Sequence, residues 1–326
     1  MASNGLNKIH FLASVQEQID KVEELMQVQA QGHHSELEAA LEHLLSSGGK
    51  RVRPAVTLLT GSMLGADEEH LITLSAAIEL LHTATLVHDD LIDGSLLRRG
   101  IPTLNANWSP AATVLTGDFI FARAAVLAAQ TKSVEVIKIF SETLATIVNG
   151  EIIQLFASRG LASRVDYYSR IHAKTASMFE LATSAAALLS PADEETIRIV
   201  SKYGYGIGMA FQIVDDVLDF TGEQVHLGKP VASDLRQGLI TLPTLCYLEN
   251  HPNDPDVKAI LNGNRHDGKH LERLIQAVRE SGAIRQALDE ARLFASKGLS
   301  ALRQIPCNEE RTALEELAEY IIYRHQ

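Results

Sequence analysis

The sequence predicts an all-α protein, a helical bundle built as one domain over residues 1–326. Alanine, leucine, glutamate and glutamine dominate long segments, and apolar residues recur there at spacings of three and four, the period of a helix with a buried face. Runs of β-branched residues in strict alternation, which predict strands, are missing. With 46% hydrophobic and 21% charged residues the chain can bury a large core, and no linker rich in proline, glycine and serine divides it.

The periodicity predicts a series of long helices with short connections. In chain order they cover residues 8–31, 33–46, 52–65, 68–93, 106–131, 134–158, 164–189, 192–221 and 234–250, with several more between 253 and 324. One start carries a strong signal: Ser190 is the expected N-cap and Pro191 the first helical residue, and Asp193 follows near the positive end of the helix dipole.

Two segments, 71–93 and 201–220, are apolar nearly all round and end in carboxylates. We expect them at the centre of the bundle, with acidic tips. Gly204, Gly206 and Gly208 do not form a GxGxxG motif, so we expect them to permit close helix packing.

Charge and cysteine content exclude several classes of protein. The net charge of −12 argues against nucleic-acid binding, which draws on clustered basic surface. The two cysteines have no metal-binding spacing, and residues 1–20 show no secretory signal, so we expect a cytoplasmic protein. The most apolar stretch, 71–87, is short and interrupted by polar residues, so we expect a core helix and no transmembrane segment.

Two acidic clusters have the same pattern, Asp-Asp-x-x-Asp. They consist of Asp89, Asp90 and Asp93, and of Asp215, Asp216 and Asp219. On a helix the first and last aspartates of each cluster lie one turn apart on one face, and like charges so placed on an apolar helix require a cation. Hard oxygen ligands suit Mg²⁺, which takes one or two carboxylates plus phosphate oxygens. The alternative, two solvated helix ends, requires a coincidence of two identical clusters.

Basic residues near the acidic clusters are the expected partners of a diphosphate, since its remaining oxygens can pair with arginine and lysine. Segments 48–54 and 97–102 place such residues beside glycines and a proline, as in loops that face an anion. Each residue alone fits ordinary surface exposure better than ligand binding, and only their grouping favours a diphosphate site. The candidates are Lys50, Arg53, Arg98, Arg99, Lys174 and Lys229.

These motifs closely resemble those of the trans-isoprenyl diphosphate synthases, in particular the longer-chain, polyprenyl branch. The resemblance extends from about residue 48 to 249 and rests on GGKRVRP, HTATLVHDDLID followed by LRRG, Gly117-Asp118, NGEIIQL, Lys174-Thr175, and FQIVDDVLDFTG followed by LGKP. It implies the isoprenoid synthase fold, an all-α bundle around a deep central cavity, and usually a homodimer. It also implies head-to-tail condensation of isopentenyl diphosphate onto an allylic diphosphate, with possible transient membrane contact when the product is released.

The resemblance assigns roles residue by residue. The six aspartates, Asp219 with less support, would hold Mg²⁺ on the allylic diphosphate. That diphosphate would also contact Arg98, Lys174, Thr175, Gln212 and Lys229. Isopentenyl diphosphate would contact Lys50, Arg53, His82 and Arg99. Asp89, Asp90, Asp93, Asp215 and Asp216, with Lys174 and Lys229, would form the catalytic set.

One departure from the family pattern and several alternatives stay open. Shorter-chain members carry a further lysine beyond the aspartate that follows Lys229, where this chain has Arg236. A farnesyl or geranylgeranyl diphosphate synthase and the catalytic subunit of a two-component long-chain synthase remain possible. A class I terpene cyclase would need no second diphosphate site, so the basic segments argue against it.

Small residues upstream of the first cluster predict long products. Thr85 and Ala84 lie four and five residues before Asp89, where farnesyl-type members carry bulky aromatic residues. We expect the growing tail to pass them, then Leu81 and Ile78, and to face part of the helix holding Val148, Asn149 and Ile152. The expected product is longer than C20, a precursor of a quinone or carrier-lipid side chain. The alternative is that Thr85 and Ala84 are small to allow close helix packing.

Overall fold

The structure, a computed structural model, describes residues 10–46, 49–98, 100–156, 163–222, 231–261 and 268–323. Every described element longer than two residues is helical, which confirms the all-α prediction. The helices are α1 His10–Ala13, α2 Gln16–Val28, α3 Ser35–Ser46, α4 Val52–Met63, α5 Glu68–Ile92, α6 Leu104–Asn107, α7 Pro110–Gln130, α8 Val134–Phe156, α9 Arg164–Ile171, the π-helix η1 His172–Ala176, α10 Ser177–Leu188, α11 Glu194–Thr221, α13 Ser233–Gln237, α14 Leu242–Asn250, α15 Pro255–Leu261, α16 Gly268–Glu280, α17 Ala283–Leu302 and α18 Glu309–Tyr323. The strands are β1 Leu97–Arg98 and β2 Ile101–Pro102.

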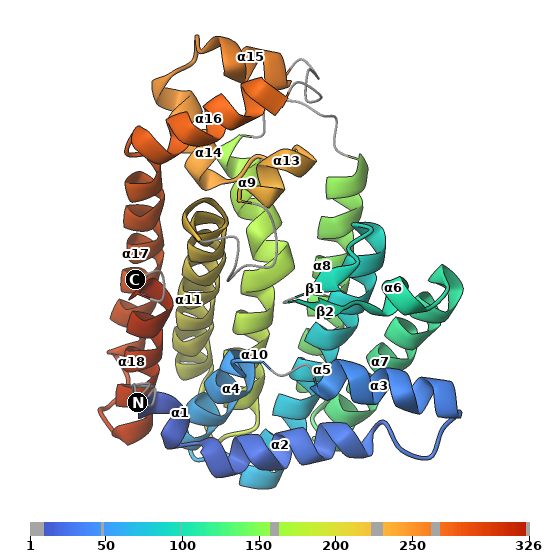
Figure 1. Cartoon of the computed structure of the whole chain (residues 1–326). Helices are drawn as coiled ribbons and strands as arrows, with labels where there is room; N and C mark the ends of the chain where they lie inside the picture. The colour runs from blue at the N-terminus through green and yellow to red at the C-terminus, as the bar shows by residue number, and fades with distance from the viewer. Residues whose placement is uncertain are drawn as a thin grey trace, which may run out of the picture.

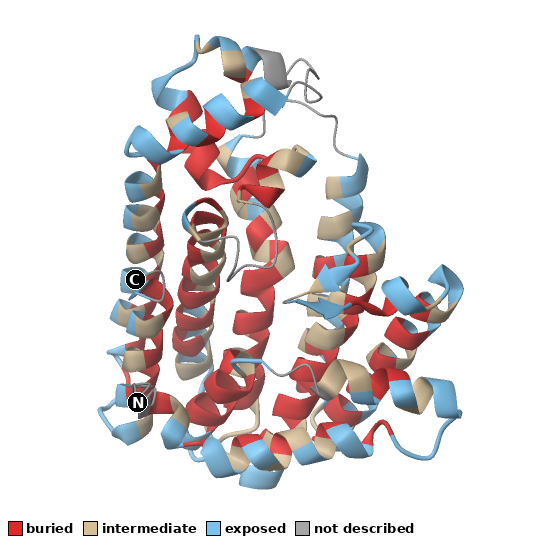
Figure 2. Cartoon of the chain, in the orientation of Figure 1, coloured by how far each residue is buried: buried red, intermediate tan, exposed pale blue. Residues whose placement is uncertain are grey.

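The long helices lie side by side, with α2 and α3 crossing one end of the bundle and α13 to α16 at the other (Figure 1). Within it α11 packs most extensively against α17 and α10, and α5 against α7 and α4. The inward sides of α4, α5, α10, α11 and α16 are buried, while the outer sides of the helices are exposed (Figure 2). The organisation of 1–326 as one domain stays a prediction.

α5 and α11 form the centre of the bundle, as their apolar sequences predict. Asp67 caps α5 by accepting a hydrogen bond from the His70 backbone N–H at 3.1 Å. By length and composition, α5 and α7 are the described helices that could cross a membrane, but 61% of the apolar stretch of α5 is buried inside the fold, against 39% for α7. The expected core helix therefore matches the burial of α5.

Three glycines let α11 approach its neighbours closely, which confirms the packing prediction for that segment. A Cβ on Gly208 would lie 2.6 Å from the Ala176 Cα, and one on Gly206 would lie 2.7 Å from the Phe294 carbonyl oxygen. Gly204 faces α10 in the same way, since its Cβ would lie 2.6 Å from the Phe179 carbonyl oxygen. Any larger side chain would separate α11 from α10 and α17.

Several predicted helices are interrupted, and one predicted start is wrong. The described part of the predicted helix 8–31 is divided into α1 and α2, and residues 106–131 are broken before α7, where the Ser109 hydroxyl caps the helix that Pro110 begins. α11 begins at Glu194, three residues later than the Ser190 cap predicts, because the Asp193 side chain accepts the Thr196 backbone N–H at 2.8 Å. The Asp193 carboxylate accepts a backbone hydrogen bond and also interacts favourably with the helix dipole. These two effects together favour Asp193 over Ser190 as the N-cap.

Two further differences lie near the acidic clusters. Residues 234–250 form the separate helices α13 and α14, because Gly238 adopts a left-handed conformation that ends α13 and Pro243 lies in the first turn of α14. In the basic segment 97–102, β1 pairs with β2 in antiparallel register, and Gly100 has φ +78°. Two pairs of residues are too short to produce the alternation from which strands are predicted.

Candidate active site

The first acidic cluster lies at the C-terminal end of α5, where each aspartate has a different environment. Asp89 is half-buried, and its Oδ2 lies 3.1 Å from the Lys174 Nζ. Asp90 is only 7% exposed and accepts three hydrogen bonds of 2.8 to 3.0 Å from Arg98. Asp93 is the exposed C-cap of the helix. Burial raises the pKa of Asp89, although the nearby Lys174 charge opposes this shift.

The second cluster lies at the C-terminal end of α11 and repeats this division. Asp215 is half-buried, whereas Asp216 is 3% exposed and accepts hydrogen bonds from the Tyr167 hydroxyl at 2.7 Å and the Gln212 amide at 2.8 Å. Burial, reinforced by the charge of Asp234, raises the pKa of Asp216 to about 8. Protein donors therefore engage both carboxylate oxygens of Asp216.

Asp219, the last aspartate of the second cluster, holds the chain that returns after α11. Its carboxylate accepts the backbone N–H groups of Ser233 at 3.1 Å and Asp234 at 3.2 Å, which are the first residues of α13. The carboxylate thus satisfies N–H groups that a helix start leaves free. Asp219 lies one turn after Asp215 on α11, and its part in metal binding stays a prediction.

A single π turn connects the two clusters. Lys174 of η1 lies between Asp89 and Glu151 of α8, whose Oε1 is 2.9 Å from the ammonium. The next residue, Thr175, donates to the Gln212 Oε1 at 2.7 Å, and Gln212 in turn donates to Asp216. Adjacent residues of η1 therefore point to opposite acidic walls, an arrangement typical of functional π turns.

Gly150 allows α8 to lie close to η1, which brings Glu151 within reach of Lys174. A Cβ on Gly150, the residue before Glu151, would lie 2.6 Å from the Ala173 Cβ, so α8 approaches η1 closely. Burial alone would lower the pKa of Lys174, but the charges of Asp89 and Glu151 outweigh this effect and raise it above its usual value. Lys174 is therefore a fixed positive charge between the walls.

The remaining predicted basic residues divide into three groups. Arg98 faces the first cluster, as described. Lys50 is exposed with its Nζ 5.7 Å from the centre of the Tyr320 ring, and the Arg53 guanidinium lies 5.2 Å from the Phe179 ring. Arg99 and Lys229 lie outside the described residues. His82 is half-buried on α5, two helical turns before Asp89 and on the same face.

Arg236 does not point to the acidic clusters. Its Nη2 lies 2.6 Å from the Glu272 Oε1 of α16, and its Nε donates to the Val231 carbonyl at 2.8 Å. Arg236 therefore braces α13 against α16 in this structure and does not take the place of the family's second lysine.

The candidate product-length residues are mostly buried. Ala84, Leu81 and Ile78 have no exposed surface, while Thr85 is half-buried and donates its hydroxyl hydrogen to the His82 carbonyl at 2.7 Å. On α8, Val148, Asn149 and Ile152 are exposed. Thr85 shares the face of Asp89, four residues away, so it is the most accessible of the four candidates on α5.

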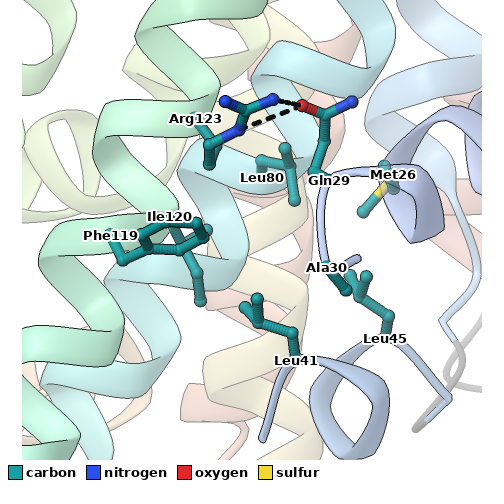
Figure 3. Close-up of a pocket in the computed structure, with 9 residues that line it drawn as sticks. All are labelled: Met26, Gln29, Ala30, Leu41, Leu45, Leu80, Phe119, Ile120 and Arg123. Carbon is teal, nitrogen blue, oxygen red and sulfur yellow. Dashed lines mark hydrogen bonds between the residues drawn. The ribbon is translucent and has the colours of Figure 1, made fainter. Parts of the chain in front are cut away.

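Two cavities of the described residues lie away from the acidic clusters. A cavity of about 10 Å³ between α2, α3, α5 and α7 is lined by apolar side chains and by Arg123, which donates to the Gln29 amide oxygen (Figure 3). An open groove of about 520 Å³ between α3 and α7 contains Trp108, Leu115 and Phe119. The deep central cavity implied by the family motifs stays a prediction.

The donor set of the two clusters fits a divalent cation that also takes phosphate oxygens. Within the described parts of the chain, no three His, Cys, Asp or Glu side chains lie together in a group that could hold a metal ion by themselves. Asp89 and Asp215 instead offer single, partly accessible carboxylates at two helix ends. Such sites match Mg²⁺, which binds through one or two carboxylates plus substrate phosphates.

Two residues that hold Asp216 and Lys174 in place were not predicted from the sequence. Tyr167 and Glu151 were not among the predicted site residues, although one binds Asp216 and the other Lys174. A signal for Tyr167 exists, because it lies seven residues, two helical turns, before Lys174 in the predicted helix 164–189. The contact itself joins residues 49 positions apart and has no local signature.

An all-helical bundle with two aspartate clusters at helix ends, joined through a lysine and a threonine, defines an enzyme that binds diphosphates with a divalent cation. Comparisons with known proteins agree. The sequence model described as "Polyprenyl synthetase" matches residues 34–278. The chain therefore belongs to the polyprenyl synthetase family and is a trans-prenyltransferase.

Three relatives illustrate the similarity. The all-trans-nonaprenyl-diphosphate synthase (geranyl-diphosphate specific) of Rhodobacter capsulatus is 38% identical, covering 87% of this chain and 88% of the relative. Heptaprenyl diphosphate synthase component 2 of Geobacillus stearothermophilus is 35% identical over 95% of this chain and 94% of its own length. The crystal structure of polyprenyl synthase from Caulobacter crescentus, complexed with calcium and isoprenyl diphosphate, has a TM-score of 0.91 at 36% identity and 97% coverage of both chains.

Proposed function

We propose that this chain catalyses Mg²⁺-dependent, head-to-tail condensation of isopentenyl diphosphate onto an allylic diphosphate, and releases an all-trans polyprenyl diphosphate longer than C20. The observation that carries the proposal is the π turn, in which Lys174 contacts Asp89 and Thr175 is linked through Gln212 to Asp216. This arrangement brings both acidic helix ends and a fixed lysine to one place. The names of long-chain relatives support the product class.

The chain's own residues bind and orient the allylic diphosphate in this reaction. Asp89, Asp93 and Asp215 are the accessible carboxylates, while Asp90 and Asp216 hold Arg98, Gln212 and Tyr167 in position. When bound, Mg²⁺ would neutralise the leaving diphosphate so that the allylic C–O bond ionises. Lys174, Thr175 and Lys229 add donors to the same group.

The second substrate binds at segment 48–54, together with His82 and Arg99. Lys50, Arg53, His82 and Arg99 are proposed to hold the diphosphate of isopentenyl diphosphate, which does not ionise. Its double bond attacks the allylic cation, and the departing diphosphate takes the proton that is then lost. The apolar walls of α5 and α11 exclude water, which protects the cation.

Product analysis tests the proposal directly. The purified chain is incubated with farnesyl diphosphate, labelled isopentenyl diphosphate and Mg²⁺, and the dephosphorylated products are separated by chain length. We expect products of C25 and above, and none after chelation of the metal. Products that end at C15 or C20 would instead indicate a farnesyl or geranylgeranyl diphosphate synthase.

The residues that set product length are tested by two matched variants. Thr85→Phe places a ring on the Asp89 face, one turn from the metal-binding carboxylates, and is expected to shorten the products while condensation continues. Ala84→Phe adds the same ring at a position with no exposed surface, where overpacking typically costs about 1–3 kcal/mol of stability. A folded, active Thr85→Phe enzyme with unchanged products would contradict the tunnel on this face.

A homodimer is proposed from the outer surface of α7 and α8. Val114, Leu115 and Val126 of α7, with Val134 of α8, are exposed apolar residues on two neighbouring helices. Exposed apolar surface of this kind is typical of an interface between copies of a chain. A cytoplasmic location and transient membrane contact during product release complete the proposal.

A second arrangement follows from the name of one relative. Because a heptaprenyl diphosphate synthase component 2 is 35% identical to this chain, the chain is alternatively the catalytic subunit of a two-component synthase. The assay of the purified chain alone distinguishes the two. Condensation without any added protein supports an enzyme that needs no second component, whereas activity that depends on a second component supports the two-component enzyme.

A further inference from the structure

Three acidic side chains are buried in the described parts of the chain: Glu79, Asp90 and Asp216. The two aspartates belong to the acidic clusters. Glu79 lies ten residues before Asp89 on α5, about 15 Å along the helix axis at 1.5 Å per residue, and is 6% exposed. A buried carboxylate needs a partner, so its partner indicates why it is there.

That partner is Arg51, which lies in the basic segment before α4. Its Nη1 is 3.0 Å from the Glu79 Oε1, and its Nε is 2.7 Å from the Oε1 of Glu23 on α2. The Arg51 side chain is 12% exposed, so two carboxylates from two different helices hold it inside the protein. We call Arg51, Glu23 and Glu79 the arginine clasp.

The backbone of Arg51 is itself unusual. It adopts φ 45° and ψ 35°, a left-handed conformation that side chains other than glycine seldom take. Such a conformation persists only where the surrounding structure over-determines it. The clasp supplies that constraint, because the guanidinium is bound on two sides.

The strained residue stands between the two basic side chains assigned to isopentenyl diphosphate. Lys50 precedes it, with its ammonium near the Tyr320 ring of α18. Arg53 follows in the first turn of α4, and its guanidinium lies 5.2 and 5.9 Å from the rings of Phe179 and Phe211. Arg51 is the N-cap of α4, so its backbone conformation sets the orientation of the preceding residue, Lys50, relative to Arg53 in the first turn of the helix.

We propose that Arg51 is a positioning residue for isopentenyl diphosphate: the clasp fixes the left-handed backbone at Arg51, and this fixes Lys50 and Arg53 in the geometry that binds the non-ionising diphosphate. Arg51 touches neither substrate and acts through its neighbours. The inference rests on the proposed function, because that function assigns Lys50 and Arg53 to this substrate. It adds Arg51, Glu23 and Glu79 to the residues that determine the affinity of that site.

The test uses the full-length enzyme and separates the KM values of the two substrates. Arg51→Gly allows the left-handed backbone without strain but removes the clasp. We expect the KM for isopentenyl diphosphate to rise at least tenfold, with the KM for farnesyl diphosphate and kcat at saturation within twofold of the wild type. Glu23→Gln loosens one side of the clasp at a partly exposed residue, and should raise the same KM about threefold.

A control variant removes a comparable guanidinium elsewhere. Arg123→Gln breaks the contact between α7 and Gln29, the C-cap of α2, which involves no residue of the basic segment, and should leave both KM values unchanged. Melting temperatures of all variants show whether each is folded. If Arg51→Gly does not fold, Glu23→Gln decides: a selective rise in its KM for isopentenyl diphosphate supports the clasp, and an unchanged KM overturns it.

Two further outcomes overturn the inference. A folded Arg51→Gly enzyme with an unchanged KM for isopentenyl diphosphate contradicts positioning, and equal changes in both KM values indicate a purely structural role. Lys50→Ala separates this failure from failure of the proposed function. If Lys50→Ala raises the KM for isopentenyl diphosphate and Arg51→Gly does not, only the clasp is wrong. If neither variant raises the KM for isopentenyl diphosphate, the assignment of this substrate to Lys50 is wrong, and so is the proposed role of the clasp.

Discussion

The second aspartate of each acidic cluster is the buried one. Asp90 is bound by Arg98, and Asp216 by Tyr167 and Gln212, so protein donors satisfy these carboxylates. The first aspartates, Asp89 and Asp215, keep accessible surface. At the scale of single residues we therefore expect the first aspartates to bind the cation and the second to fix the helix ends.

Asp89→Ala should reduce kcat about a hundredfold or more, since it removes a carboxylate proposed to bind the cation on the leaving diphosphate, and no core volume. Steady-state kinetics with farnesyl and isopentenyl diphosphates measure the loss. Asp67→Ala is the control on the same helix: it removes the N-cap of α5, costs about 1 kcal/mol of stability, and should leave kcat unchanged. Wild-type turnover in Asp89→Ala would remove Asp89 from the proposed site.

Tyr167→Phe should weaken metal binding without unfolding the protein, because the ring stays and only the hydrogen bond to Asp216 is lost. In the presence of inorganic diphosphate, Mn²⁺ binding followed by electron paramagnetic resonance should weaken several-fold. Tyr203→Phe is the matched control, since its buried hydroxyl donates to the Leu314 carbonyl, away from both clusters. Equal Mn²⁺ affinity in both variants would show that Tyr167 only packs.

The sequence predicts the acidic residues and their places at helix ends well, because helix periodicity and charge are local properties. It does not predict their partners. Tyr167 and Asp216 are 49 residues apart, and Arg51 is 28 residues from both Glu23 and Glu79. These contacts depend on which helices pack together, and no spacing along the chain encodes that.

At the scale of elements, the glycines of α11 determine how closely this helix packs against α10, α17 and η1. The prediction of close packing holds because glycine within a helix is otherwise costly and needs a packing reason. The interruptions were harder to predict: residues 164–189 read as one amphipathic helix, yet they form α9, η1 and α10. A π turn keeps the apolar pattern nearly continuous, so periodicity alone cannot locate it.

Gly208→Ala tests the packing of α11 on η1. The new Cβ would lie 2.6 Å from the Ala176 Cα, and a backbone atom cannot move away as a side chain can. We expect a loss of about 1–3 kcal/mol in the free energy of unfolding, measured by urea denaturation, together with lower kcat because η1 carries Lys174 and Thr175. Gly268→Ala, in α16 with open space around its Cβ, should not destabilise the protein. Equal stability of both variants would contradict tight packing at Gly208.

At the scale of the whole molecule, one side of the bundle exposes apolar side chains of α7 and α8. α7 is apolar enough in sequence to be a core helix, yet less than half of its apolar stretch is buried within one chain. The proposed homodimer would bury this exposed apolar surface of α7. The sequence periodicity predicts a helix over 106–131 but not the side of the molecule on which it lies.

Leu115→Glu should convert a dimer into a monomer, because it places a charge on the exposed apolar surface of α7. Sedimentation velocity measures the change. Leu293→Glu is the matched control: Leu293 is a similarly exposed leucine on α17, at a distance from α7 in the bundle, and its replacement should not alter the sedimentation coefficient (Figure 1). If the Leu115→Glu protein remains dimeric, the interface lies elsewhere.

The π turn at His172–Ala176 makes the site sensitive to the number of residues in the chain as well as to their identity. One residue of an α-helix corresponds to about 100° of rotation around its axis, at 3.6 residues per turn. Deleting a single residue from η1 would leave α9 and α10 able to form one regular helix. Tyr167 would then rotate relative to Lys174 and Thr175, and could no longer face Asp216 while they face Asp89 and Gln212. Substitutions can thus accumulate around this turn, but a change of length by one residue would separate the groups that it aligns.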